Sequence, residues 1–191
     1  MTETRKTTPG DAPSLDAAAG SATEKHVFKI RIEGTLDQVW HELTKTDEVQ
    51  KAMFDSQMHT DGLEPGGTIC MRSVDGKYTA VVGKVLKVVP RQILSHTFRF
   101  TTYDDPECTV TYDLKETDGG VDFKLTSEGV PSGTKTAKQM KQGGPMICNT
   151  LKAVVETGKP PLGTRILYVL FKLLAPLNPK RCRSENWPIP A

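Results

Sequence analysis

The sequence has 191 residues, the length of one domain of ordinary size with tails. Its 25 basic and 23 acidic residues give a formal net charge of +2. This near balance argues against a dedicated nucleic-acid binder, which carries a basic excess. There is no apolar stretch of about 18 residues and no apolar secretory segment near the start, so we expect neither a transmembrane helix nor a signal peptide. Four separated cysteines without a CxxC pair favour a reduced, cytoplasmic protein over a disulfide framework or a zinc site.

Residues 1–24 consist mainly of Thr, Ala, Gly, Ser, Pro and charged residues, with one leucine and no aromatic residue. Such a segment buries too little apolar surface to offset its ordering entropy. We therefore expect a disordered N-terminal arm.

A strand and a helix are expected next. Phe28, Ile30 and Ile32 alternate with charged residues, which is typical of a half-buried strand. In the following segment Thr35 and Gln38 have the spacing of a capping box, and the apolar positions of 36–43 share one helical face. A second short helix is expected over roughly 47–53.

Five further segments have the patterns of strands: 68–74, 78–89, 92–100, 108–115 and 121–127. Turn residues such as Asp75-Gly76 separate them, and the spacing favours an antiparallel meander. A long helical stretch follows over 132–157, with Gly158 as a C-cap. Because Pro145 lies inside this stretch, the helix is expected to restart or kink there.

This order of elements predicts an α+β fold in which a curved antiparallel sheet of about six or seven strands wraps around a long C-terminal helix. A sheet with one apolar face must cover that face, and the long helix is the only element large enough to do so. The space between the sheet and the helix is then a candidate pocket.

Several motifs in this order resemble the SRPBCC superfamily, also called START-like, Bet v-like or helix-grip. The similar segments are TLDQVWHELTK, Gly83 to Leu86 followed by Val89-Pro90-Arg91, Thr109 to Leu114, and Gly143 to Gly158. Within the superfamily, the chain is most similar to the branch of the C-terminal domain of the activator of heat-shock protein 90 ATPase. The resemblance covers about 25–158 and leaves 159–191 as an extension. It implies a domain with a cavity but no single activity.

The alternation of side chains places a set of apolar and aromatic residues between sheet and helix. These cavity candidates are Met71, His96, Phe98, Phe100, Tyr112, Phe123, Met140, Met146 and Ile147. A solid core made of the same residues is the competing interpretation. A buried His96 or Tyr112 could serve as an acid–base group, but a hydrogen-bonded core residue is the commoner case. Asp104-Asp105-Pro106 is interpreted as a turn and not as a metal site, and no cofactor, metal or catalytic motif is expected.

The extension over 159–191 differs in composition, because its six cations and single acidic residue give a net charge of +5. Its apolar stretch 164–177 is too short to cross a bilayer. We expect it to pack on its own domain, with a dimer contact or contact with an anionic membrane surface as alternatives. Trp187 is expected in an extended tail that docks through its ring.

The leading functional hypothesis is non-catalytic binding of a small hydrophobic or amphipathic ligand in the cavity. The resemblance implies an alternative, a co-chaperone that activates heat-shock protein 90 ATPase. A third hypothesis is a cyclase- or hydrolase-type enzyme that uses a histidine or tyrosine of the cavity. The expected partners are accordingly a small apolar molecule and either a chaperone or a second copy of the chain.

Overall fold

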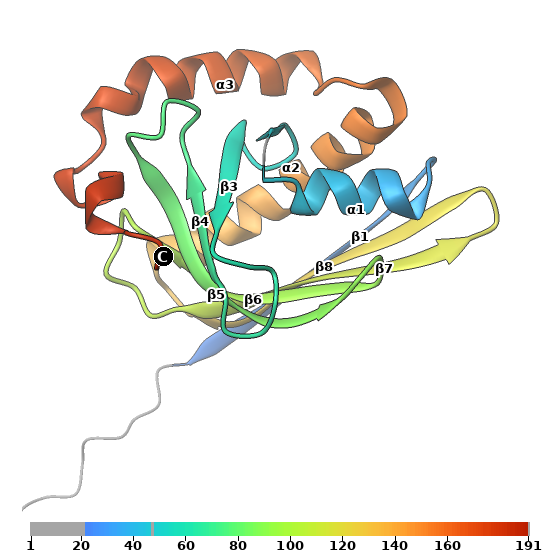
Figure 1. The fold of residues 1–191 in the computed structure, drawn as a ribbon, viewed down its shortest axis with the longest axis horizontal. Helices are drawn as coiled ribbons and strands as arrows, with labels where there is room; N and C mark the ends of the chain where they lie inside the picture. Colours follow the sequence, from blue (N-terminus) through green and yellow to red (C-terminus); the bar gives the residue numbers. More distant parts are fainter. Residues whose placement is uncertain (1–21, 47, 191) are drawn as a thin grey trace, which may run out of the picture.

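A computed structural model describes residues 22–190 except residue 47, so most of the expected N-terminal arm lies outside the described residues. Eight antiparallel strands form one curved sheet in the order β1-β8-β7-β6-β5-β4-β3-β2 (Figure 1). The strands are β1 (Thr23–Ile32), β2 (Val49–Gln50), β3 (Ser56–Thr60), β4 (Thr68–Arg72), β5 (Thr79–Val89), β6 (Ile93–Phe100), β7 (Cys108–Thr117) and β8 (Gly120–Pro131). The first strand therefore pairs with the last, as a helix-grip fold requires.

Over residues 22–190, residue 47 excepted, the α-helices are α1 (Leu36–Thr44), α2 (Lys135–Thr157) and α3 (Leu162–Leu174). Three short 3-10 turns follow at Ala175–Leu177, Lys180–Cys182 and Ser184–Asn186. The capping box of Thr35 and Gln38 is present at the start of α1, and Gly158 ends α2 in a left-handed conformation with φ 77°. The start of α1 and the end of α2 are therefore where the sequence predicts them.

The long helix α2 does not restart at Pro145 but continues through it. Pro145 is exposed, so water can bond the carbonyl group that proline leaves without a donor. A proline ring crowds the Cβ atom of the residue before it, and Gly144, which precedes Pro145, has no Cβ atom.

The prediction of a second short helix over 47–53 is wrong. The described residues there form the two-residue strand β2, which pairs with β3, and then a turn. Strand β3 has four polar residues in five, which explains why its pattern does not predict a strand. These two strands raise the count to eight.

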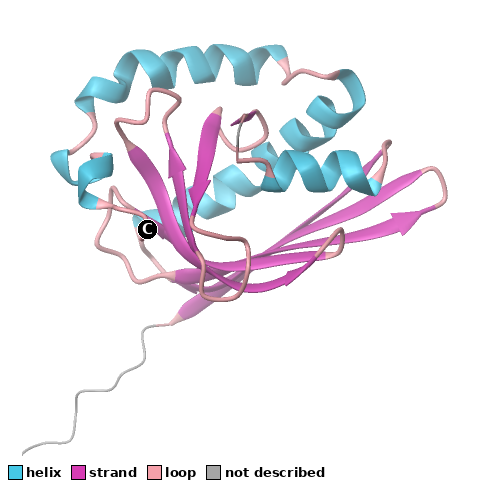
Figure 2. Ribbon diagram, viewed as in Figure 1, coloured by secondary structure: helices cyan, strands magenta, loops and turns pink. Residues whose placement is uncertain are grey.

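The layers confirm the predicted α+β helix-grip class (Figure 2). Helix α2 packs on β1 and β8, and α1 packs on α2, β7 and β8. The buried core lies between them and includes Leu94, Phe123 and Leu151, which are at most 1% exposed. No helix in the described part of the chain is long and apolar enough to cross a membrane.

Candidate functional site

Aromatic rings form a continuous row on the side of the sheet that faces α2. Phe123 of β8 stacks on Tyr112 of β7, whose ring centroid is 5.8 Å from that of His96 on β6. The row continues along β6 to Phe98 (6.4 Å from His96) and then to Phe100 (4.8 Å from Phe98). Strand alternation explains the arrangement, since residues two apart share a face.

Burial decreases along this row. Phe123, Tyr112 and His96 are buried, at 1%, 7% and 5% exposure, whereas Phe98 and Phe100 are only partly buried. The row therefore begins in the core and ends near the surface, beside the loop that follows β6.

The other predicted cavity residues lie around the same space. Met71 of β4 and Ile147 of α2 are partly buried and pack against the core, and Met140 of α2 is buried. The Cys108 thiol and the Met140 sulfur are 3.6 Å apart, so the sheet and α2 are in direct contact there. Met146 is partly buried and is not among the residues packed against the core. The structure thus brings eight of the nine predicted residues into or against one cluster.

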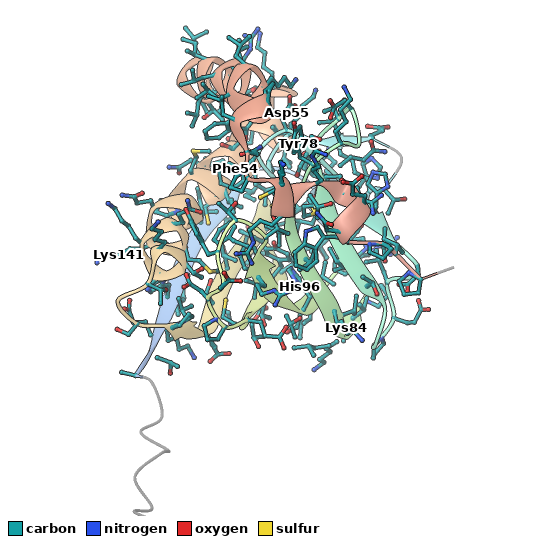
Figure 3. The ribbon with its side chains drawn as sticks, turned by 90° about the vertical axis from the view of Figure 1, so that its left-hand side faces the viewer. Phe54, Asp55, Tyr78, Lys84, His96 and Lys141 are labelled. Carbon is teal, nitrogen blue, oxygen red and sulfur yellow. The ribbon has the colours of Figure 1, made fainter. Side chains whose placement is uncertain are left out.

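His96 is held as a neutral ring. Its Nδ1 donates a hydrogen bond of 2.7 Å to the carbonyl oxygen of Thr97, and burial lowers the pKa of His96 below its ordinary value. In Figure 3, His96 lies low on the sheet, whereas Phe54 and Asp55 lie near α2 and α3. The ring therefore packs among aromatic neighbours, as a core histidine does.

The other titratable groups along the row are also neutral. Burial raises the pKa of Tyr112, whose hydroxyl lies 4.0 Å from the sulfur of Met53. Burial likewise raises the pKa values of Cys108 and Cys148 to about 11. Such an environment suits apolar surface, since a charged ligand group would lose its hydration without a fixed charge to replace it.

Two grooves on the described surface lie elsewhere. One of about 450 Å³ lies over β1, β7 and β8 and is lined mainly by charged residues, among them Lys29, Asp113 and Lys124. The other, of about 370 Å³, is lined by Lys77, Tyr78, Arg183 and Glu185. Neither lies between α2 and the sheet, where side chains of the core meet.

The two acidic residues of the loop after β6 have structural partners. Asp105 accepts a hydrogen bond from the backbone N–H of Thr136 at the start of α2, and Asp104 pairs with Arg181 of the tail. Among the described residues, no cluster of three or more potential metal ligands occurs. The turn lies at 101–102, whereas 104–107 form an irregular loop, so the predicted turn at Asp104-Asp105-Pro106 is displaced towards β6.

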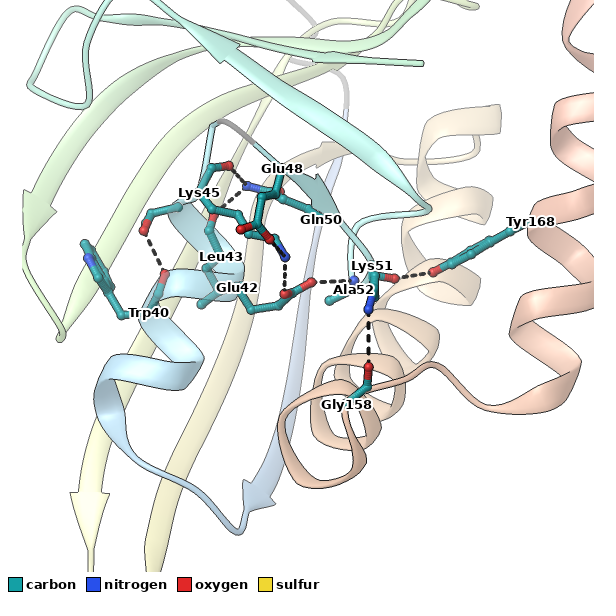
Figure 4. A network of polar contacts seen from close by, with 11 residues as sticks. Trp40, Glu42, Leu43, Lys45, Glu48, Gln50, Lys51, Ala52, Gly158 and Tyr168 are labelled. Atoms are coloured by element: carbon teal, nitrogen blue, oxygen red, sulfur yellow. Dashed lines mark hydrogen bonds and ion pairs between the residues drawn. The ribbon is translucent and has the colours of Figure 1, made fainter. Parts of the chain in front are cut away.

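A buried polar network beside α1 was missed by the sequence analysis (Figure 4). Glu42 accepts the backbone N–H of Ala52 at 3.1 Å and pairs with Lys45 at 2.7 Å. Gln50 is fully buried and donates to the carbonyl oxygens of Leu43 and Lys45. The only sequence signal was the spacing of Glu42 and Lys45, which is equally typical of an exposed helical pair.

The C-terminal tail docks on the opposite side of the sheet, and its Trp187 is held as expected. The indole N–H of Trp187 donates to the carbonyl oxygen of Arg181, and Arg99 lies over its ring at 5.0 Å. Arg72 donates to the carbonyl oxygen of Trp187, at 2.9 Å. Arg99 and Phe100 are adjacent on β6, so they point to opposite faces, and Trp187 lies on the face away from the aromatic row.

Comparison with known proteins agrees with this architecture. A family model described as Activator of Hsp90 ATPase homolog 1-like protein matches residues 33–156. The chain belongs to this family. The match leaves out α3 and the tail, and no curated protein matches the sequence.

Solved structures of the same fold have low sequence identity to this family member. The Aha1 dimer from Colwellia psychrerythraea has a TM-score of 0.57 at 18% identity, covering 71% of this chain and 98% of that one. CalU16 from Micromonospora echinospora has a TM-score of 0.56 at 17% identity, covering 81% and 93%. DynU16, a protein in the dynemicin biosynthetic locus, has a TM-score of 0.56 at 22% identity, covering 71% of this chain but 48% of that one. At these identities the shared property is the fold.

Proposed function

We propose that this family member binds a small hydrophobic or amphipathic molecule between the sheet and α2, without catalysing a reaction on it. The observation that carries the proposal is the decrease in burial along the aromatic row, from Phe123 to Phe98 and Phe100. An apolar molecule that inserts at the accessible end covers aromatic surface that otherwise faces water.

The side chains around that end are suited to rearrangement. Met71 of β4 pairs with Val81, which pairs with Phe100, and Met140 of α2 contacts Cys108, which pairs with Phe98; methionine is unbranched and adapts to irregular shapes. Since both side chains pack against the core cluster, binding requires them to move. Apolar surface then contributes about 25 cal/mol per Å² buried, before the cost of that rearrangement.

The methionines also offer a local test. Protein labelled with ¹³C at the methionine methyl groups is titrated with 1-anilinonaphthalene-8-sulfonate, an amphipathic probe, and followed by NMR. We expect saturable shifts at Met71 and Met140. Helix α3 contains no methionine, so adsorption of the probe there does not mimic the result.

A blocked variant provides the control. Met71→Trp fills the accessible end and is expected to weaken probe binding at least tenfold, whereas Leu86→Trp, at a residue 47% exposed on β5, is expected to leave it unchanged. Absence of methyl shifts at the solubility limit of the probe refutes the proposal, as does equal binding by Met71→Trp and wild type.

Activation of a heat-shock protein 90 ATPase is a second candidate function, favoured by the family match over 33–156. It predicts that an excess of this protein raises the steady-state ATP turnover of a purified heat-shock protein 90 several-fold. The Met71→Trp variant retains this stimulation if the interaction uses the outer surface. Unchanged turnover at saturating protein removes this candidate.

A further inference from the structure

Helix α3 presents two unlike sides. Toward the domain, Tyr168 is its only buried residue, and the Tyr168 hydroxyl donates to the carbonyl oxygen of Lys51 at 2.9 Å (Figure 4). Lys172 pairs with Asp55 at 2.5 Å. The expectation that this segment packs on its own domain therefore holds for one side only.

The other side of α3 is apolar and exposed. Six of its residues recur at helical spacing and are 46–72% exposed: Leu162, Ile166, Val169, Leu170, Leu173 and Leu174. Together they form a stripe about 20 Å long at 1.5 Å per residue. Soluble monomers rarely expose contiguous apolar patches larger than a few hundred Å², and such patches mark interaction sites.

Contacts before, within and beyond α3 hold this stripe in place. Before the N-terminal end of α3, the Lys51 ammonium group donates to the Gly158 carbonyl oxygen, and at the middle of α3 the Tyr168 hydroxyl donates to the Lys51 carbonyl oxygen. Beyond the C-terminal end, Arg183 forms a β-bridge with Tyr78, and Trp187 docks as described above. Figures 1 and 3 show α3 as the outermost element on its side of the molecule. The stripe is thus a ridge and not the wall of a groove.

Charge indicates what covers the ridge. The charged residues of α3 are Arg165 and Lys172, and the segment 159–191 has a net charge of +5 whereas the rest of the chain has −3. A second copy of the chain, packed through a two-fold axis, would bring the same basic segments together, and like charges across an interface cost free energy. A planar anionic surface avoids this repulsion and attracts the same cations.

We propose that α3 docks the protein on anionic lipid membranes, lying in the plane of the interface with its apolar stripe among the acyl chains. An amphipathic helix with cations beside its apolar face binds membranes in this way. The docking does not depend on a ligand between the sheet and α2, so it stands or fails separately from the proposed function.

Flotation with vesicles tests the proposal on the full chain. Vesicles of phosphatidylcholine are compared with vesicles in which about one third of the lipid is phosphatidylserine. Each cation near the surface raises partitioning roughly fivefold, so we expect at least tenfold tighter binding to the anionic vesicles. Raising the salt concentration from about 0.1 to about 0.5 M shortens the screening length and is expected to reduce that preference.

Matched variants locate the contact. Ile166→Glu and Leu173→Glu place a negative charge in the stripe and are expected to weaken binding at least tenfold, with unchanged circular dichroism and melting temperature because both side chains point to solvent. Leu86→Glu introduces the same charge at an exposed apolar residue of β5, and Met71→Trp blocks the proposed ligand site. Both are expected to float as wild type does.

Two results overturn the proposal. One is equal flotation of wild type and Ile166→Glu with anionic vesicles, or none by either. The other is the combination of a wild-type protein that does not float with vesicles and a dimer in sedimentation velocity that Ile166→Glu dissociates. That combination assigns the ridge to a second copy of the chain.

Discussion

Two adjacent glycines of α2 are expected to respond to alanine in opposite directions. A Cβ atom added at Gly144 would lie 2.6 Å from Cζ of Phe28 on β1, and closer still to two other carbons of that ring. A Cβ atom added at Gly143 would meet only Cζ of Phe54, at an ordinary contact distance of 3.5 Å. The two sites share one helix and differ chiefly in this neighbour and in their position relative to Pro145.

The magnitudes follow from two opposing effects. Alanine in a helix interior is more favourable than glycine by roughly 0.5–1 kcal/mol. Overpacking a rigid neighbour costs typically 1–3 kcal/mol. Gly143→Ala is therefore expected to stabilise the protein by about 0.5–1 kcal/mol, and Gly144→Ala to destabilise it by about 1–2 kcal/mol. For a chain of this size, each kcal/mol shifts the melting temperature by roughly 2–4 °C.

Urea denaturation followed by circular dichroism at neutral pH measures both changes. Alanine at 144 also crowds the ring of Pro145, so the contact with Phe28 is isolated by repeating the substitution in a Phe28→Ala background. There the cost of Gly144→Ala is expected to fall by at least half. The reasoning is refuted if Gly144→Ala is as stable as Gly143→Ala, or if removing the ring leaves its cost unchanged.

Three further predictions concern other parts of the chain. Trp187→Ala loosens the tail over the buried thiol of Cys70. Alkylation of Cys70, followed by mass spectrometry, is therefore expected to accelerate roughly tenfold per 1.4 kcal/mol of docking free energy lost. An unchanged alkylation rate would show that the tail does not protect the thiol. Burial lowers the pKa of His96 in the folded protein, so below about pH 6.5 unfolding is accompanied by proton uptake at this residue. The free energy of unfolding is therefore expected to fall as pH falls below that value, by up to about 1.4 kcal/mol per pH unit. His96→Phe is expected to flatten this dependence in urea denaturation, and an equal slope in both proteins would contradict it. Glu42→Ala leaves the nearly buried Lys45 without its closest partner and is expected to lower the free energy of unfolding by about 3 kcal/mol. Adding Lys45→Met to the same chain is expected to recover most of this loss. Equal stability of the single and double variants would argue against a buried charge as the cause.

Local patterns predicted the regular elements well where one face is apolar and the other polar. The alternation around Phe28 and the capping box at Thr35 each depend on neighbours within one strand or one turn, and both are present. The placement of most cavity candidates in one cluster follows from the same alternation, because residues two apart on β6 and β7 share the face toward α2. Whether a ligand separates those side chains is a property of packing, which alternation does not determine.

The failures arise where partners are distant in sequence. The segment expected to form a second helix became β2 because Gln50 and Ala52 find their hydrogen bonds on α1, a choice that no local pattern shows. Helix α2 passes through Pro145 because its neighbours are glycine and solvent, whereas proline propensity alone predicts an interruption.

By itself, the sequence determined the α+β class, the order of most elements and the residues of the core, since hydrophobic periodicity and caps are local properties. The tertiary structure decided how accessible the aromatic row is, which side of α3 faces water, and what the C-terminal tail covers. Apolar residues occur nearly all around α3, so periodicity could not distinguish a buried side from an exposed one. Tyr168 and Lys172 settle this through contacts with residues more than a hundred positions away. Burial is a relation between distant segments, and it becomes defined only when the chain has folded.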